Sequence, residues 1–95
     1  MIVNHILAAS RIPYILEQRN IQIEGNLLSI DIDDKKGVSV LLLKCEDVLK
    51  FEGSTLKRFD NPINDYIGRL EVELEGVKIF ACVYKTDLVK LNIEN

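Results

Sequence analysis

Few residues of this chain have side chains suited to catalysis. His5 is the only histidine, and Cys45 and Cys82 are the only cysteines among the 95 residues. A cysteine nucleophile needs an imidazole or another base beside it, and the spacing of these residues along the chain does not bring them together. We therefore interpret both cysteines as small apolar side chains and His5 as a residue at a helix surface or helix end. A small enzyme or ligand-binding protein with a Cys/His pair is the alternative hypothesis.

Metal and cofactor chemistry finds little support in the residue pattern. Zinc sites use cysteine or histidine pairs at close spacing, and the chain has no CxxC or HxxxH. The run Asp60, Asn61, Asn64 and Asp65 has oxygen ligands, but it lacks the spacing and final glutamate of a calcium-binding EF-hand loop. Asn61 and Pro62 are typical instead of the start of a short helix over Asp60–Gly68. The sequence predicts no metal and no cofactor.

Charge and hydropathy disfavour two further classes of partner. The formal net charge of −3 weighs against nucleic-acid binding, which requires cations that neutralise phosphate. Lys57, Arg58 and Phe59 form the one basic cluster beside an aromatic ring, and this hypothesis is the weakest. No apolar run approaches the ~20 residues that span a bilayer. Met1–Ser10 lacks a basic start, so we expect it to belong to the fold.

The first twenty residues have a helical pattern that positions nothing catalytic. Ile2, Ile6, Ala9, Ile12 and Leu16 recur at helical spacing. Pro13 is tolerated only in a first helical turn or at a kink. Two predictions fit: a kinked helix from Asn4 to about Arg19, or a shorter helix that starts at Ser10 and has Pro13 in its opening turn.

From Ile21 onward the chain alternates apolar and polar residues, which predicts strands and hairpins. One hairpin turns at Gly25-Asn26 and sets Ile23 opposite Leu28. A polar turn follows at Asp33–Gly37, and Val38–Lys44 is apolar on both faces, as in a covered inner strand. Cys45–Phe51 fits a bent strand or a short helix.

The last hairpin turns at Glu75-Gly76. An even-length turn there pairs Glu73 with Lys78 and Val72 with Ile79, which keeps apolar residues on one face. After a turn at 85–87, Leu88–Ile93 is predicted as a final strand. The fold class is α+β: one domain over 1–95, with the N-terminal helix packed on a curved antiparallel sheet of five to six strands. This sheet is built from hairpins and could close into a barrel-like form.

The most suggestive surface is aromatic. If Val77, Ile79, Ala81 and Val83 face the core, Phe80, Cys82 and Tyr84 lie on the opposite face of their strand. The N-terminal helix covers that face, or it forms a patch with a charged rim, which is typical of a binding surface. The loop with Phe59 and Tyr66 is a second candidate surface. The predicted partner-binding residues are Phe80, Tyr84, Glu71, Glu73, Lys78, Phe59 and Tyr66.

These observations favour a small, non-catalytic protein-binding module: an inhibitor, an immunity-type antidote or an accessory subunit. Its partner is another protein, whose identity the sequence does not indicate. An edge strand could also pair with a second copy, which would make a homodimer. The two cysteines form no disulfide framework, and we expect a cytoplasmic location.

Overall fold

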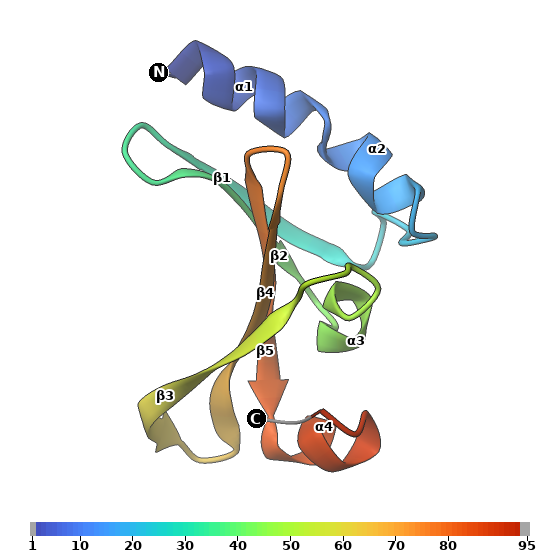
Figure 1. Cartoon of the computed structure of the whole chain (residues 1–95), viewed down its shortest axis with the longest axis vertical. Coiled ribbons are helices and arrows are strands. Elements are labelled where there is room, and N and C mark those ends of the chain that lie inside the picture. The colour runs from blue at the N-terminus through green and yellow to red at the C-terminus, as the bar shows by residue number, and fades with distance from the viewer. Residues whose placement is uncertain (1, 94–95) are drawn as a thin grey trace.

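A sheet of five strands carries helices on one of its faces (Figure 1). The computed structural model describes residues 2–93. The strands are β1 (Leu27–Asp33), β2 (Gly37–Leu42), β3 (Thr55–Ile63), β4 (Tyr66–Leu74) and β5 (Val77–Tyr84), in the spatial order β1-β2-β5-β4-β3. The helices are α1 (Ile2–Ser10), α2 (Ile12–Glu17), α3 (Cys45–Val48) and α4 (Lys85–Lys90). The prediction of an α+β fold with an N-terminal helix packed on a five-stranded sheet is confirmed.

Two details of the predicted sheet differ from the structure. The sheet is mixed, because β2 and β5 run parallel while the other three pairs are antiparallel. It is also open, with β1 and β3 at its two edges, and does not close into a barrel. The parallel pair arises because α3, β3 and β4 come between β2 and β5 in the chain, and parallel neighbours need such a long crossover.

The β4–β5 hairpin has the predicted register. Val72 lies opposite Ile79 and Glu73 opposite Lys78. Glu75 and Gly76 form its turn with positive φ values of 50° and 81°, a conformation that glycine adopts without strain. The polar turn after Asp33 is also confirmed, since its carboxylate accepts the backbone N–H groups of Lys35 and Lys36 at 2.7 and 2.8 Å.

The hairpin predicted at Gly25-Asn26 is wrong. The chain does turn there, since the Leu27 N–H donates to the Ile23 carbonyl at 2.9 Å. However, residues 21–26 form no strand, and β1 pairs with β2 instead. Ile21 is anchored in the core at 3% exposure, whereas Ile23 is 39% exposed. A turn signal indicates a reversal but does not decide which segments pair across it.

Two further predictions are wrong about the type of element: a predicted helix is a strand hairpin, and a predicted strand is a helix. Asp60–Gly68 is not helical: it belongs to the β3–β4 hairpin, which turns at Asn64 with φ 56°. Pro62 lies in edge strand β3, where a missing N–H is tolerated. The strand predicted over Leu88–Ile93 is wrong, because Lys85–Lys90 forms α4. The Asp87 carboxylate accepts the Tyr84 N–H at 2.8 Å and so stabilises the start of this helix.

The N-terminal helix combines both predicted forms. It breaks at Arg11 into α1 and α2, and Pro13 lies in the opening turn of α2. Cys45–Phe51, which fitted two predictions, contains the short helix α3. α1, α2 and α3 contribute to one core of buried residues, and Leu88 and Leu91 of α4 pack against it.

The strand register separates the sheet into two faces. The first carries buried Val38, Val40, Val77, Ile79 and Ala81, and the helices pack there; we call it the helix face. The opposite side is the open face, because α1, α2 and α3 pack on the helix face. α4 follows Tyr84 at the end of β5, where its Asp87 and Lys90 line a small hollow together with Cys82 and Tyr84. Its central residues are Leu41, Lys57, Tyr66, Arg69, Glu71, Glu73, Lys78, Phe80, Cys82 and Tyr84.

Candidate protein-binding surface

The open face brings together side chains that the sequence assigned to two separate surfaces. The register places Phe80 beside Glu71, and Tyr84 beside Tyr66. The N-terminal helix packs on the opposite face of the sheet, so it does not cover these residues. Phe59 joins them because it lies two residues after Lys57 on β3, which puts it on the same face, and its ring contacts that of Tyr66.

Three aromatic rings meet at one end of this face, and we call them the aromatic cluster: Phe59, Tyr66 and Tyr84. The ring centroids of Phe59 and Tyr66 are 4.8 Å apart, edge to face at 89°. Those of Tyr66 and Tyr84 are 5.5 Å apart. Both separations are typical of attractive aromatic pairs. Tyr84 remains 48% exposed and Phe59 36%, so the cluster is ordered by its own contacts yet available to a partner.

Phe80 lies further along β5 under a cation. The guanidinium carbon of Arg69 is 5.2 Å from the centre of its ring, within the range of a cation–π contact. Leu41 of β2 is opposite Phe80 in the parallel register and is half-buried. Arg69 thus covers one face of the Phe80 ring, which would otherwise be exposed to solvent.

Glu71 has a different role from the exposed rim residue that the alternation predicted. It is only 5% exposed. Lys57 Nζ is 2.7 Å from one carboxylate oxygen and Arg69 Nε 2.8 Å from the other. Burial raises the pKa of Glu71, but the Lys57 hydrogen bond and the Arg69 charge outweigh it and hold the pKa below its usual value. Glu71 therefore orders two cations, while Glu73 is exposed and Lys78 half-buried.

Arg69 is the residue of this surface that the sequence reasoning missed. Arg69 and Glu71 are two apart on one strand, and this spacing puts both side chains on the same face. That signal was present in the sequence. The missing information was the position of Lys57, which comes from β3 and lies opposite Arg69 only once the β3–β4 hairpin forms.

Tyr66 is held by a polar contact at the back of the aromatic cluster. The Cys82 thiol donates to the Tyr66 hydroxyl at 3.3 Å. This contact, together with burial, raises the pKa of Tyr66 to about 12. The contact fixes the middle ring of the cluster and leaves the edges of the outer rings exposed.

The cysteines and His5 do not form the arrangement of a thiol enzyme. Burial and the nearby Asp87 carboxylate raise the pKa of the Cys45 thiol to about 11, whereas a cysteine nucleophile requires a lowered pKa. Cys82 bonds to Tyr66. The His5 Nδ1 atom is buried and has no hydrogen-bond partner among residues 2–93, so neither thiol is hydrogen-bonded to this atom.

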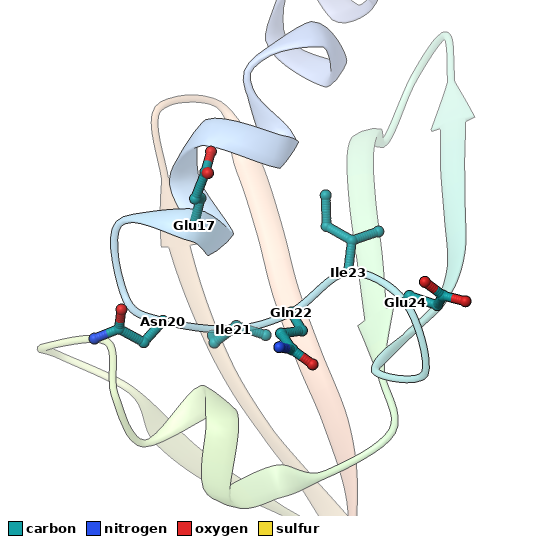
Figure 2. Close-up of a pocket in the computed structure, with 6 residues that line it drawn as sticks. All are labelled: Glu17, Asn20, Ile21, Gln22, Ile23 and Glu24. Atoms are coloured by element: carbon teal, nitrogen blue, oxygen red, sulfur yellow. The ribbon is translucent and has the colours of Figure 1, made fainter.

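A hollow of about 600 Å³ lies below α2, and Figure 2 shows its lining. Ile23 points into the space between α2 and the β1–β2 hairpin, while Glu17 projects from the last turn of α2. The lining residues contribute two carboxylates and two amides, with no cysteine or histidine. They are Glu17, Asn20, Ile21, Gln22, Ile23 and Glu24.

The basic cluster at Lys57 is also less available than its sequence suggests. Lys57, one of its two cations, is engaged by the Glu71 carboxylate. Within residues 2–93, no three acidic, histidine or cysteine side chains are grouped closely enough to hold a metal ion. None of the helices in that range has the length and hydropathy needed to cross a membrane.

Comparisons of the chain with protein families, curated proteins and solved structures give no match. The arrangement of its own side chains is therefore the basis for any function assigned to it.

Proposed function

We propose that this chain is a non-catalytic protein-binding module, of the inhibitor, antidote or accessory-subunit kind, and that it binds through the open face. The observation that carries the proposal is the aromatic cluster of Phe59, Tyr66 and Tyr84, whose two outer rings, Phe59 and Tyr84, remain exposed. Tyrosine and other aromatic residues are enriched in the energetic centres of protein interfaces.

The surface is already ordered before a partner arrives. Arg69 is held by both Phe80 and Glu71, and Lys57 is held by Glu71. Side chains that are fixed in advance lose less conformational entropy on binding. This ordering supports a binding role for residues that would otherwise be costly to immobilise.

The charges indicate what kind of partner fits. Lys57 and Arg69 share the single carboxylate of Glu71, which leaves net positive charge in this network beside the rings. We therefore propose a folded protein with an apolar depression for Tyr84 and acidic side chains around it. Such complementarity speeds association and selects between partners.

The experiment starts with the chain as bait in an extract of its source cells, followed by identification of the retained protein. Titration calorimetry with that purified protein then compares the wild type with Tyr84→Ala and Phe59→Ala. We expect each substitution to weaken binding about 30-fold, because central aromatic residues contribute about 2 kcal/mol or more. Val89→Ala is the control, since Val89 lies on α4 with 86% exposure. Equal affinity for the wild type and both aromatic variants would refute this surface.

Two further aspects of the proposal concern the surroundings of the protein. We propose a cytoplasmic location, supported by the two free cysteines Cys45 and Cys82, because thiols stay reduced in that compartment. We also propose that the chain forms a homodimer through an edge strand, and the two edges of the sheet differ sharply in their suitability.

A further inference from the structure

We propose that two copies of this chain pair through β1, in an antiparallel register centred on Ile30. This interface is distinct from the open face, so either proposal can fail without the other. Within residues 2–93, β1 is an edge strand with β2 as its one neighbour in the sheet. The edge of such a strand presents unpaired backbone N–H and C=O groups to a further strand.

The side chains of β1 are unusually apolar and unusually exposed. Ile30 and Ile32 lie opposite Val40 and Val38, so they belong to the helix face. Val40 and Val38 are buried at 0% and 2% exposure, yet Ile30 remains 44% exposed and Ile32 40%. Leu28 is 55% exposed. The helices therefore cover the outermost strand of the helix face only in part.

The opposite edge of the sheet carries protection that β1 lacks. β3 contains Lys57, Arg58 and Pro62 and leaves its ladder after Arg58. Lysine, proline and irregular pairing are the usual means by which edge strands avoid pairing with other chains. β1 is less protected: it has no lysine, arginine or proline, its charged residues are Asp31 and Asp33, and its ladder has one bulge, between Leu27 and Ser29. The difference between the edges points to β1 as the strand that pairs.

α1 adds a second apolar feature next to this edge. It packs against β1 and β2, as Figure 1 shows. Among its residues 3–10, the buried position is the small Ala8, whereas Val3, Ile6 and Leu7 are 54–56% exposed. A soluble amphipathic helix normally turns its larger apolar side chains toward the core. α1 instead presents them outward, which is expected of a helix that is completed by another molecule.

Two-fold symmetry brings these features together. Antiparallel pairing of β1 with the β1 strand of a second copy creates a two-fold axis perpendicular to the sheet. The helix faces of the two copies then lie on the same side of one continuous sheet, and the two α1 helices lie on either side of the interface. Such an interface uses the same patch on each copy. The bulge shortens the regular ladder, so α1 has to contribute to the roughly 800 Å² per partner of a standard interface.

The charges of β1 select the register. With Ile30 at the centre, Leu28 of one copy lies opposite Ile32 of the other, and Ser29 lies opposite Asp31. Moving the centre by one residue to Asp31 would set the two Asp31 carboxylates directly opposite each other, which is unfavourable for like charges. The register at Ile30 is thus the one that pairs apolar residues and separates the acids.

Light scattering coupled to size exclusion tests the dimer across low to high micromolar concentrations. We expect a dimer mass for the wild type and a monomer for Ile30→Lys. Ile63→Lys is the matched control, because Ile63 is an aliphatic residue of the other edge strand with 70% exposure; it should remain dimeric. A wild type that is monomeric throughout, or two variants that behave alike, would overturn the proposal. Circular dichroism checks that each variant is folded.

Cysteine cross-linking tests the register without a charged substitution. In a Cys82→Ala background, Ile30→Cys places two thiols directly opposite each other across the axis. Opposed residues in antiparallel strands have Cα atoms about 4.5–5.5 Å apart, which suits a disulfide. We expect mild oxidation to link Ile30→Cys into a covalent dimer and to link Asp31→Cys much less, because Asp31 faces Ser29. Equal linking of both variants, or none, would overturn this register.

Discussion

At the scale of single residues, Glu71 shows how a buried charge can organise a surface. Its carboxylate lies beneath Lys57 and Arg69 rather than in solvent. Burial of a charge is unfavourable unless it is compensated by close partners. Here the compensation comes from two cations that are themselves partly exposed, so the net contribution of the network to stability is modest.

We expect Glu71→Gln to lower the free energy of unfolding at neutral pH by about 1 kcal/mol, since it removes charge-assisted contacts of this kind. The folded-state pKa of Glu71 is below its usual value of 4.5. Its stabilising contribution is therefore fully present above pH 4.5 and is lost as the pH falls below it. Urea denaturation at pH 7 and pH 3 measures the difference, which should shrink at pH 3.

Glu73→Gln provides the control for this experiment. Glu73 is on the same strand and the same face, but it is exposed, and its substitution should change stability by less than about 0.5 kcal/mol. If Glu71→Gln were as stable as the wild type at pH 7, the expectation would be wrong. The free-energy cost of burying the carboxylate would then equal the stabilisation from its ion pairs with Lys57 and Arg69.

The two cysteines should differ strongly in reactivity. Cys45 is 4% exposed and its pKa is raised to about 11 from 9.0, so at pH 8 its thiolate fraction falls about 100-fold. Cys82 is only half-buried. We expect iodoacetamide to modify Cys82 first and Cys45 only after unfolding in urea, as measured by mass spectrometry of peptides. Rapid alkylation of Cys45 in the native protein would revive the cysteine-enzyme hypothesis.

At the scale of elements, the segments that were predicted correctly are those in which two independent signals agree. In the β4–β5 hairpin, only one turn length keeps Val72 and Ile79 on the same face, and Gly76 supplies the turn. At Gly25-Asn26 the chain does turn as predicted. However, Ile21 is buried in the core and β1 pairs with β2, so the predicted strand before the turn does not form. A local sequence pattern does not indicate which of several distant segments a strand will pair with.

The predictions for Asp60–Gly68 and Leu88–Ile93 were wrong because the residue patterns there are compatible with both a helix and a strand. Asn61 and Pro62 suit the start of a helix, but they also suit a ladder irregularity in an edge strand. Leu88 and Leu91 are three apart, which fits one face of a helix, and the Asp87 cap favours that choice. The alternation along β4 and β5 nevertheless placed Phe80, Tyr84 and Glu73 on one face. The link to Phe59 could not be predicted, because it depends on the β3–β4 hairpin.

Gly68 is the position where the β3–β4 hairpin is most sensitive to substitution. A Cβ atom there would overlap the backbone carbonyl oxygen of Lys57 on β3. We expect Gly68→Ala to lower the free energy of unfolding by about 1–3 kcal/mol, as overpacking does. Urea denaturation measures this loss. Thr55→Ala, at an exposed position of β3, should have little effect. An unchanged stability of Gly68→Ala would show that the two strands can separate locally without cost.

At the scale of the whole molecule, the two candidate surfaces lie on opposite sides of one sheet. The open face is polar and aromatic, and Glu71 orders two of its cations, Lys57 and Arg69. The surface formed by α1 and β1 is aliphatic. Polar aromatic surfaces are typical of partners that associate and separate, whereas aliphatic ones are typical of permanent assemblies. A dimer through β1 would leave both open faces accessible, so one dimer could hold two partner molecules.

A permanent dimer has a thermodynamic consequence that a monomer lacks. When unfolding also separates two chains, mass action raises the melting temperature with protein concentration. For a domain of this length, each tenfold rise in concentration should raise Tm by about 3–6 °C. Differential scanning calorimetry over a hundredfold concentration range measures this dependence. Ile30→Lys should melt at one temperature throughout that range, and Ile63→Lys should follow the wild type. A wild-type Tm independent of concentration would mean that the exposed aliphatic side chains of β1 and α1 are tolerated by a monomer.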